Sequence, residues 1–333
     1  MAINEIRNCS IKGIVNILAP TTELNSEIID FDADSFQLRT GISTRKVSTS
    51  IKNPIKDYFS QGLEKLINKL NWNVTEVDVL ICITQTPDIL FPSIATRLHG
   101  DFGFSSKTLC FDINLGCSGY VYGLQVAMSL LNSLQTEVSK AIICVGDISS
   151  RVIPNEDTSL RPLFSDGVSV TAIEKNPLNL FTTFFNLETF GSGSEAIKSV
   201  TENGLQLMKM NGIDVFNYSF QYVPVSIQKL FSTYNLSTSE IDFAIFHQAN
   251  KMINEAIRKS VGFSDNQTLY SIEKYGNTAI ASIPITLSEH KEKVIQKDTK
   301  VIFCGFGVGF SIATCVLTLE KSIVLATFAF DEN

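Results

Sequence analysis

The sequence predicts an α/β fold built from two related halves, and three observations carry this prediction. Apolar runs typical of buried strands alternate with stretches of helical periodicity along the chain. Two segments of the first half recur, in the same order, in the second. The apolar fraction is 44% over 333 residues, which is enough for a large core.

The repeat is visible in two pairs of segments. TEVDVLICITQT (75–86) matches SEIDFAIFHQAN (239–250), and KAIICVG (140–146) matches KVIFCGF (300–306). The separation is nearly the same for both pairs, and it places Gly116-Cys117 on Gly276-Asn277. We therefore predict one half over 1–178 and a second over 179–333, packed about a pseudo-two-fold axis.

Each half is expected to run strand, helix, strand, helix, strand, which favours buried mixed sheets. The predicted strands are VDVLICIT (77–84), TLCFDINL (108–115), KAIICVG (140–146), IDFAIFH (241–247) and KVIFCGF (300–306). The predicted helices span 55–70, 118–134, 215–234 with a break near Pro224, 250–260, and a segment after Ile280.

Composition argues against several classes of protein. The net charge of −7 disfavours a nucleic-acid binder that relies on its overall field. No apolar run approaches the roughly 20 residues that span a bilayer, and the first residues lack a signal-peptide pattern. Seven cysteines without a CxxC pair, together with three histidines, favour a reduced cytoplasmic protein without a structural zinc site.

Cys117 is the first candidate for chemistry. It lies between Gly116 and Gly119, after a strand-like run and before a helical one. Such a turn puts the sulfur at a helix N-terminus, where the helix dipole favours the thiolate. A nucleophile is therefore predicted here, and a small apolar core residue is the plainer alternative.

Three further segments carry polar or flexible residues at strand ends. His247 ends the run IDFAIF, and ligand or catalytic groups favour this end of strands in α/β sheets. Asn277 follows Gly276, and CGFGVGFS (304–311) offers backbone N–H groups suited to an oxyanion. The plainer alternatives are a partly buried, hydrogen-bonded side chain for His247, a helix cap for Asn277 and a sharp turn for the Gly-rich segment.

Taken together, these segments resemble the β-ketoacyl-acyl carrier protein synthase III family of thiolase-like condensing enzymes. The resemblance runs to about Leu319 and is carried by LRTGISTRKV (38–47), QTPDILFPS (85–93), DINLGCSGY (112–120), FSDG (164–167), MNGIDVF (210–216), FHQAN (246–250), GNTAIASIP (276–284) and GFGVGFS (305–311). It implies a layered αβαβα sandwich with two mixed five-stranded sheets. The tail 321–333 runs beyond the family pattern.

The resemblance implies a condensing acyltransferase. Cys117 would take an acyl group from a thioester, with an oxyanion held by the backbone of Cys117 and of the Gly307-Val308-Gly309 turn. His247 and Asn277 would stabilise the enolate formed when a malonyl-type carrier-protein thioester loses CO₂. The product would be a 3-oxoacyl thioester, with no metal and no permanently bound cofactor.

Binding residues are also implied by the resemblance. Phe91 would reach into the acyl pocket of a partner subunit, so a homodimer is expected, although a core phenylalanine is the alternative. Residues of the phosphopantetheine tunnel would be Gly212, Phe216, Ala249, Asn250 and Ile253. An acidic acyl carrier protein would dock on Lys251, Arg258 and Lys259, for which a solvated helix face is the alternative.

The substrate and the reaction leave alternatives open. Ser35 stands where the family often has a tryptophan that stacks on coenzyme A, which favours a carrier-protein donor over acyl-CoA and a specialised pathway. Plain acyl transfer to a hydroxyl or amine, with His247 as general base, is the second function considered. A thiolase that uses Cys304 as base and an inactive partner subunit are further alternatives.

Overall fold

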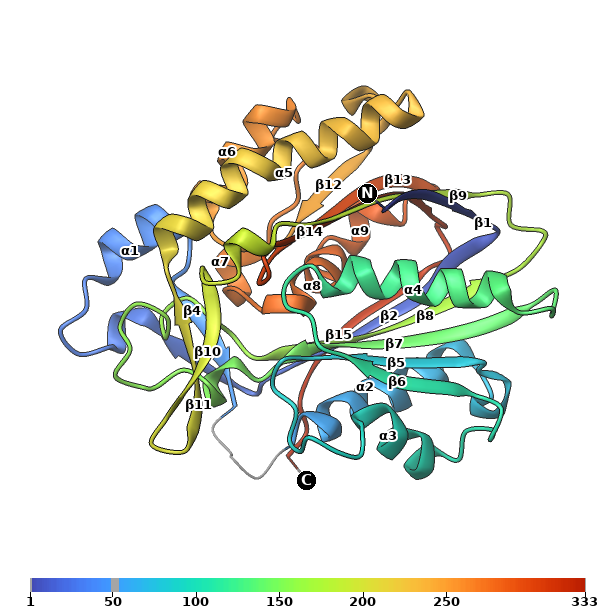
Figure 1. Ribbon diagram of the computed structural model, residues 1–333, viewed down its shortest axis with the longest axis horizontal. Helices are drawn as coiled ribbons and strands as arrows, with labels where there is room; N and C mark the ends of the chain where they lie inside the picture. The colour runs from blue at the N-terminus through green and yellow to red at the C-terminus, as the bar shows by residue number, and fades with distance from the viewer. Residues whose placement is uncertain (1, 49–53, 333) are drawn as a thin grey trace.

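The computed structural model describes residues 2–48 and 54–332 of the chain. Two mixed sheets lie face to face with helices between them and helices on both outer faces, as Figure 1 shows.

The strands of the described residues are β1 (Ala2–Arg7), β2 (Cys9–Leu18), β3 (Thr21–Leu24), β4 (Thr44–Val47), β5 (Val79–Ile83), β6 (Leu109–Ile113), β7 (Ser139–Asp147), β8 (Gly167–Lys175), β9 (Thr182–Thr189), β10 (Ile197–Glu202), β11 (Leu205–Met210), β12 (Phe243–Phe246), β13 (Thr299–Gly307), β14 (Ser311–Leu319) and β15 (Val324–Ala329). The α-helices are α1 (Ala33–Thr40), α2 (Ile55–Leu70), α3 (Ile94–Phe102), α4 (Gly119–Ser133), α5 (Gly212–Tyr234), α6 (Lys251–Val261), α7 (Ile272–Tyr275), α8 (Ser282–Glu289) and α9 (Lys291–Val294).

Five layers follow from the packing of these elements. Helices α2 and α3 cover the outer face of one sheet, and α5 with α6 covers the outer face of the other. Between the sheets lie α4 and α8, each of which packs on strands of both. Because both central helices are apolar on several sides, the largest core cluster lies in this middle layer. The predicted αβαβα sandwich is confirmed.

The two sheets differ in size, which corrects the expectation of two five-stranded sheets. The order of one is β1-β9-β14-β13-β12, and that of the other is β15-β2-β8-β7-β5-β6. The sixth strand, β15, comes from the tail and pairs in parallel with β2, Val324 opposite Gly13. Phe330, just beyond it, stacks on Tyr58 of α2 with ring centroids 3.9 Å apart.

The duplication is visible in the hydrogen bonds of the repeated residues. In the first half, the Asp78 N–H donates to the Lys140 carbonyl, and the Lys140 N–H donates to the Asp78 carboxylate. In the second half, Asp242 and Lys300 make the same two bonds. The counterpart of β6 is shortened to a parallel bridge between Ala244 and Thr268. The duplicated fold is confirmed, whereas the division at 178/179 stays a prediction.

The predicted helices and strands are found where expected, with one difference. Helix 55–70 is α2 in full, and 118–134, 250–260 and the segment after Ile280 are α4, α6 and α8. Helix α5, however, continues through Pro224 without a break. Pro224 is buried, and α5 packs on strands of the five-stranded sheet, so tertiary packing overrides the local preference of proline.

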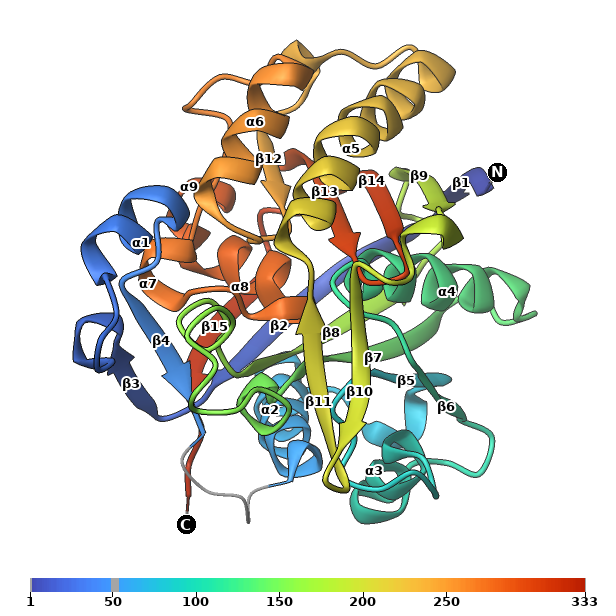
Figure 2. The same ribbon diagram turned by 60° about the vertical axis from the view of Figure 1, so that its left-hand side comes forward.

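A hairpin of β10 and β11 projects beside the sandwich, as Figure 2 shows. It is tied to the loop after β7 by a hydrogen bond of 2.7 Å from the Met208 N–H to the Val152 carbonyl. This hairpin therefore walls the region at the ends of β5, β6 and β7.

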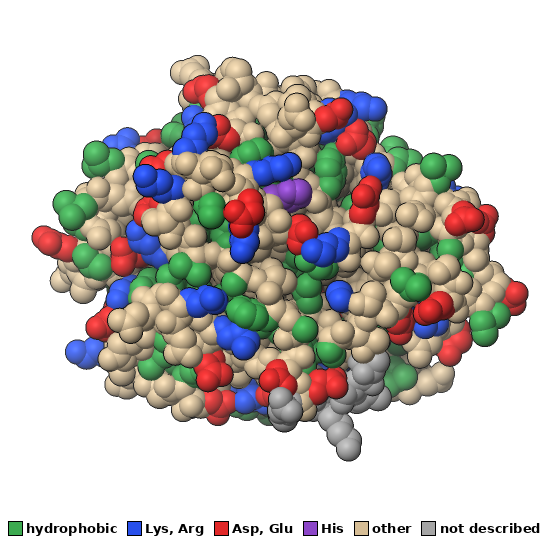
Figure 3. Space-filling view, turned by 180° about the vertical axis from the view of Figure 1, so that it is seen from behind, with side chains coloured by type: hydrophobic (Ala, Val, Ile, Leu, Met, Phe, Trp, Pro, Cys, Tyr) green, Lys and Arg blue, Asp and Glu red, His purple; other side chains and the backbone are tan. Residues whose placement is uncertain are grey.

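The surface seen in Figure 3 carries acidic and basic side chains interspersed, without a large patch of one sign. Within 2–48 and 54–332, no helix combines the length and the apolar character needed to cross a membrane.

Candidate active site

Cys117 lies in the turn between β6 and α4, two residues before the helix begins. Its side chain is buried and reaches the wall of a cavity. A hydrogen bond of 2.6 Å joins Ser118 Oγ to Ser311 Oγ at the start of β14, and Ser311 Oγ also donates to the Val308 carbonyl. The cysteine turn is thus fixed to the Gly-rich turn of the other half.

Two glycines of β13 allow the backbone to approach Cys117. A Cβ atom at Gly305 would lie 2.7 Å from the Cys117 carbonyl oxygen, which is closer than real Cβ atoms come. A Cβ atom at Gly307 would lie 3.2 Å from Cys117 Sγ. The glycines at this strand end therefore allow close contact, Gly305 with the backbone of Cys117 and Gly307 with its side chain.

Two backbone N–H groups near the sulfur have no acceptor in another residue. Among the described residues, the Val308 N–H donates no backbone hydrogen bond, and the Cys117 N–H interacts only with its own thiol. Val308 lines the same cavity as Cys117, and its side chain packs on Gly116. Both N–H groups are therefore available to an oxygen of a ligand in this cavity.

His247 follows β12 and is buried, with its ring 5.5 Å from the Phe306 ring in an edge-on arrangement. Its Nδ1 lies 2.8 Å from Ser282 Oγ, which also accepts the Gln248 N–H. Burial lowers the pKa of His247 to about 3, and a hydrogen bond to the backbone of Ala279 opposes that shift. The imidazole is therefore neutral at physiological pH.

Asn277 lies between α7 and α8 with its amide buried. Its Oδ1 accepts the Ala279 N–H at 2.9 Å, and its Nδ2 donates to the Ala249 carbonyl at 3.4 Å. Ala279 in turn lines the cavity that Cys117 reaches. His247 and Asn277 themselves do not line this cavity, and both contact its wall through Ala279.

The cavity has a volume of about 530 Å³. Its apolar wall comes from both halves and includes Ile113, Val152, Phe164, Ile197 and Met208. The remaining wall carries polar side chains, among them Thr84, Thr86, Asp147 and Ser149. A volume of this order accommodates a small organic group.

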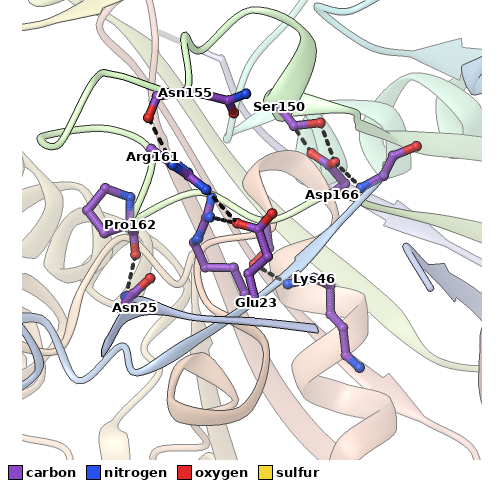
Figure 4. A network of polar contacts seen from close by, with 11 residues as sticks. Glu23, Asn25, Lys46, Ser150, Asn155, Arg161, Pro162 and Asp166 are labelled. Carbon is purple, nitrogen blue, oxygen red and sulfur yellow. Dashed lines mark hydrogen bonds and ion pairs between the residues drawn. The ribbon is translucent and has the colours of Figure 1, made fainter. Parts of the chain in front are cut away.

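The loop that supplies part of this wall is held by polar contacts, drawn in Figure 4. Asp166 accepts hydrogen bonds from the Ser150 N–H and Oγ, at 2.9 and 2.6 Å. Farther along, Arg161 donates to the Asn155 carbonyl, and Asn25 donates to the Pro162 carbonyl. The two ends of the segment 150–166 are therefore joined to each other, and its Pro162 is bonded to Asn25, just after β3.

The thiol of Cys117 is protonated in the resting protein. Burial raises its pKa to about 12, and the charge of Asp147 adds to the shift. Burial therefore opposes the effect expected of the helix dipole, and it favours the neutral thiol in the resting protein.

We expect alkylation of Cys117 by iodoacetamide to rise about tenfold for each pH unit between pH 7 and 9. The thiolate is the reactive form, and its fraction grows in this way at every pH below the pKa. Mass spectrometry of the Cys117 peptide measures the rate. A rate that begins to level off at about pH 8.5 would show that the thiol has an ordinary pKa.

The predicted tunnel residues do not line the cavity beside Cys117. Ala249 and Ile253 are buried near the start of α6, and Asn250 caps that helix by accepting the Ile253 N–H. Gly212 and Phe216 lie in the first turns of α5. The five positions lie on two neighbouring helices, α5 and α6, and the loop before α6.

The three residues predicted to dock a carrier protein differ in how exposed and how free to pair their charges are. Lys251 and Lys259 are exposed on α6, and Lys251 pairs with Glu273 at 3.2 Å. Arg258 instead is buried, with its guanidinium 2.7 Å from both Glu255 and Asp265. Because its charge is satisfied within the chain, the structure does not support Arg258 as a docking cation.

Phe91 is 83% exposed and lies beside Leu90, which is 87% exposed. The alternative of a core phenylalanine is therefore wrong for this chain. Ile89 and Leu90 also line the mouth of the cavity.

Cys304 does not act as a second thiol of the site. It is fully buried in β13, where the Thr314 hydroxyl donates to its sulfur at 3.2 Å. Its sulfur is engaged inside the sheet between β13 and β14, which argues against the thiolase alternative for this residue. Over 2–48 and 54–332, no group of three or more His, Cys, Asp or Glu side chains could hold a metal ion.

Three residues of the site had no role in the sequence analysis. Ser282 contacts His247 Nδ1, Phe306 meets its ring, and Asp147 lies beside Cys117. Ser282 belongs to the GNTAIASIP segment and Phe306 to the GFGVGFS segment, so their position in these motifs was the available signal for both. Asp147 ends a strand-like run, which was the available signal for it.

The duplicated five-layer sandwich with a buried cysteine between β6 and α4 defines a thiolase-like fold. Residues 111–189 match the family described as 3-oxoacyl-[acyl-carrier-protein] synthase III, and residues 231–319 match its C-terminal domain. A β-ketoacyl-[acyl-carrier-protein] synthase III of Lactococcus lactis is 31% identical over 307 residues, covering 88% of this chain and 93% of the relative. One of Streptococcus uberis is 30% identical over 306 residues, with the same coverage.

A crystal structure of a 3-oxoacyl-(acyl-carrier protein) synthase from Burkholderia xenovorans superposes with a TM-score of 0.93 at 25% identity. The superposition covers 98% of this chain and 99% of that structure. The chain therefore belongs to the β-ketoacyl-acyl carrier protein synthase III family, and the predicted class of condensing acyltransferase is confirmed.

Proposed function

We propose that this protein takes an acyl group onto Cys117 and condenses it with a malonyl-type carrier-protein thioester, releasing CO₂ and a 3-oxoacyl thioester. The observation that carries the proposal is the position of the Cys117 and Val308 N–H groups, neither of them bonded to another residue, on the cavity that the sulfur reaches.

In the first half-reaction, Cys117 Sγ attacks the carbonyl carbon of the acyl thioester and loses its proton as the new bond forms. The carbonyl oxygen becomes an oxyanion, which the two backbone N–H groups stabilise. Collapse of the tetrahedral intermediate breaks the bond to the leaving thiol, which departs with a proton. The acyl group then remains on Cys117 as a thioester.

In the second half-reaction, the malonyl group loses CO₂, and the bonding electrons move to an enolate. Neutral His247 and the amide of Asn277 are the proposed donors to its oxygen. The Ser282 hydroxyl accepts the Gln248 N–H and can donate its own hydrogen to His247 Nδ1, which leaves the ring hydrogen on Nε2. The carbanion attacks the acyl carbon and expels the Cys117 thiolate, which is reprotonated.

The dimer and the partners complete the proposal. The exposed apolar segment of Ile89, Leu90 and Phe91 supports a homodimer in which Phe91 enters the acyl pocket of the other subunit.

Lys251 and Lys259 are the proposed contacts for an acidic carrier protein. Gly212, Phe216, Ala249, Asn250 and Ile253 are proposed to hold the pantetheine arm. Seven unpaired cysteines support a reduced, cytoplasmic location.

The test is the intact mass of the protein after exposure to acyl groups carried by coenzyme A and by acyl carrier protein. We expect an acyl adduct on Cys117, followed by CO₂ release and loss of the adduct when malonyl carrier protein is added. An adduct that transfers to a hydroxyl or amine without CO₂ release would favour plain acyl transfer. If no thioester in the panel acylates Cys117, the proposal lacks its first step.

A further inference from the structure

Asp147 is a carboxylate in the cavity beside Cys117 that the proposed mechanism does not use. It ends β7, lies on the wall of the cavity and is 5% exposed. Its negative charge raises the pKa of the Cys117 thiol, so the carboxylate lies close enough to the sulfur to act on it. An acyl chain on Cys117 therefore enters a space that this carboxylate borders.

One oxygen of the Asp147 carboxylate is occupied and the other is open. Oδ1 accepts the Thr84 hydroxyl at 2.9 Å, the Gln85 N–H at 2.7 Å and the Thr86 hydroxyl at 3.3 Å. Oδ2 takes part in none of these bonds, and it is not among the unpaired polar atoms that the described residues cover completely. Oδ2 therefore keeps accessible surface, and this surface faces the cavity that Asp147 lines.

The charge of Asp147 has no counter-ion within 2–48 and 54–332. Burial raises its pKa to about 6, and the groups that oppose this shift are neutral hydrogen-bond donors. Lys198, the basic side chain on the cavity wall, is paired with Glu195 at 2.6 Å. Asp112, the other carboxylate on the wall, accepts two N–H groups at the start of α3. Buried charges are normally paired, so this cavity lacks a cation that a ligand can supply.

We infer that the acyl group loaded on Cys117 carries a protonated amine, which pairs with Asp147 Oδ2. The class of acyl donor is then an aminoacyl thioester, and Asp147 is the residue that selects it. The inference rests on the proposed acylation of Cys117. It leaves the chemistry of acyl transfer unchanged, because no bond to the amine forms or breaks.

An amine fits this carboxylate better than the other ends that an acyl chain can carry. An ammonium group donates to Oδ2 and neutralises the buried charge, whereas a hydroxyl donates but leaves the charge unpaired. A hydrocarbon end covers Oδ2 with carbon and excludes the water that solvates it. A carboxylate end brings two like charges together in a buried space. The open oxygen of Asp147 therefore favours a cation.

The experiment measures rates of adduct formation on the full-length protein by intact mass at pH 7.5. The donors are butyryl, 2-aminobutyryl, 3-aminobutyryl, 3-hydroxybutyryl, hexanoyl and 6-aminohexanoyl thioesters, each on coenzyme A and on acyl carrier protein. We expect at least one aminoacyl thioester to load about tenfold faster, or more, than the hydrocarbon thioester of the same length.

Asp147→Asn keeps the shape of the side chain and removes its charge, so the ratio of the two rates should fall to about one. The matched control is Asp242→Asn. Asp242 also accepts a backbone N–H with its carboxylate, but it lies before β12 in the second half and does not line the cavity. This variant should leave the ratio unchanged.

A pH series on the unmodified protein tests the inference without a variant. The carboxyl of Asp147 is protonated below its pKa of about 6, whereas the amine of 6-aminohexanoyl stays protonated throughout this range. The preference for the amine should therefore fall about tenfold between pH 7.5 and pH 5. Taking the ratio of two donors cancels the effect of pH on the Cys117 thiol. The other titratable groups on the cavity wall, Asp112 and Lys198, have partners of their own.

Equal loading of every aminoacyl thioester and its hydrocarbon counterpart at pH 7.5 would overturn the inference and leave the proposed function intact. A preference for the amine that survives in Asp147→Asn, or at pH 5, would overturn it as well. Faster loading of 3-hydroxybutyryl than of every aminoacyl thioester would also contradict it, since the substituent would then be uncharged. Failure of all donors to acylate Cys117 would instead remove the proposed function, and this inference with it.

Discussion

Cys117→Ala is expected to abolish acyl loading and to lower turnover by at least about a thousandfold, because the covalent intermediate cannot form without the sulfur. The two N–H donors remain in such a variant, so binding of the thioester is retained. The measurement is intact mass for loading and release of labelled CO₂ from malonyl carrier protein for turnover.

A matched cysteine provides the control. Cys110 lies in β6, seven residues before Cys117, and does not line the cavity. Cys110→Ala should load and turn over within about twofold of the unmodified protein. An adduct that persists in Cys117→Ala and disappears in Cys110→Ala would show that Cys110, and not Cys117, is the nucleophile.

Asn277→Ala and His247→Ala are expected to separate the two half-reactions. Both side chains are proposed to donate to the enolate oxygen and not to the acyl thioester. Loading of Cys117 should therefore stay within a few fold, while CO₂ release falls by about 10²–10³, the usual effect of losing one donor to a developing oxyanion. Stopped-flow loading and CO₂ release measure the two steps on the same preparations.

Residues of the same type outside the site test whether such losses are specific. Asn132 lies near the end of α4 and donates to the Arg7 and Met128 carbonyls, and His290 follows α8 with its Nε2 near the Tyr270 carbonyl. Asn132→Ala and His290→Ala should keep full CO₂ release. Equal loss of loading and CO₂ release in Asn277→Ala would place that amide in acylation or in folding.

The fold was largely predictable because its signals are local. Helix α2 has a clear apolar face and begins just after a proline, so both its position and its length follow from the pattern. The repeated Asp–Lys pairs, Asp78 with Lys140 and Asp242 with Lys300, showed the duplication because the same hydrogen bonds are needed in each half. The sixth strand was not predicted, since β15 pairs with residues more than 300 positions away, Val324 opposite Gly13.

The site was predictable only in part. Glycines beside Cys117 indicated a close approach of the backbone, and Gly307 shows that approach. The state of the thiol was not predictable, because it depends on burial and on Asp147, which come together only in the folded chain. The same holds for Arg258, whose partners Glu255 and Asp265 satisfy it from either side. Helical spacing alone places a charge on a face but does not show what neutralises it.

Strand β15 has a consequence for handling the protein. By pairing along β2, it seals an edge that would otherwise expose a row of free backbone donors and acceptors on an apolar strand. Shortening the gene at Glu320 would open that edge, and the trimmed chains could then recruit one another strand to strand and precipitate. Affinity handles for purification are accordingly better placed after Asn333 as an addition than in exchange for the last residues.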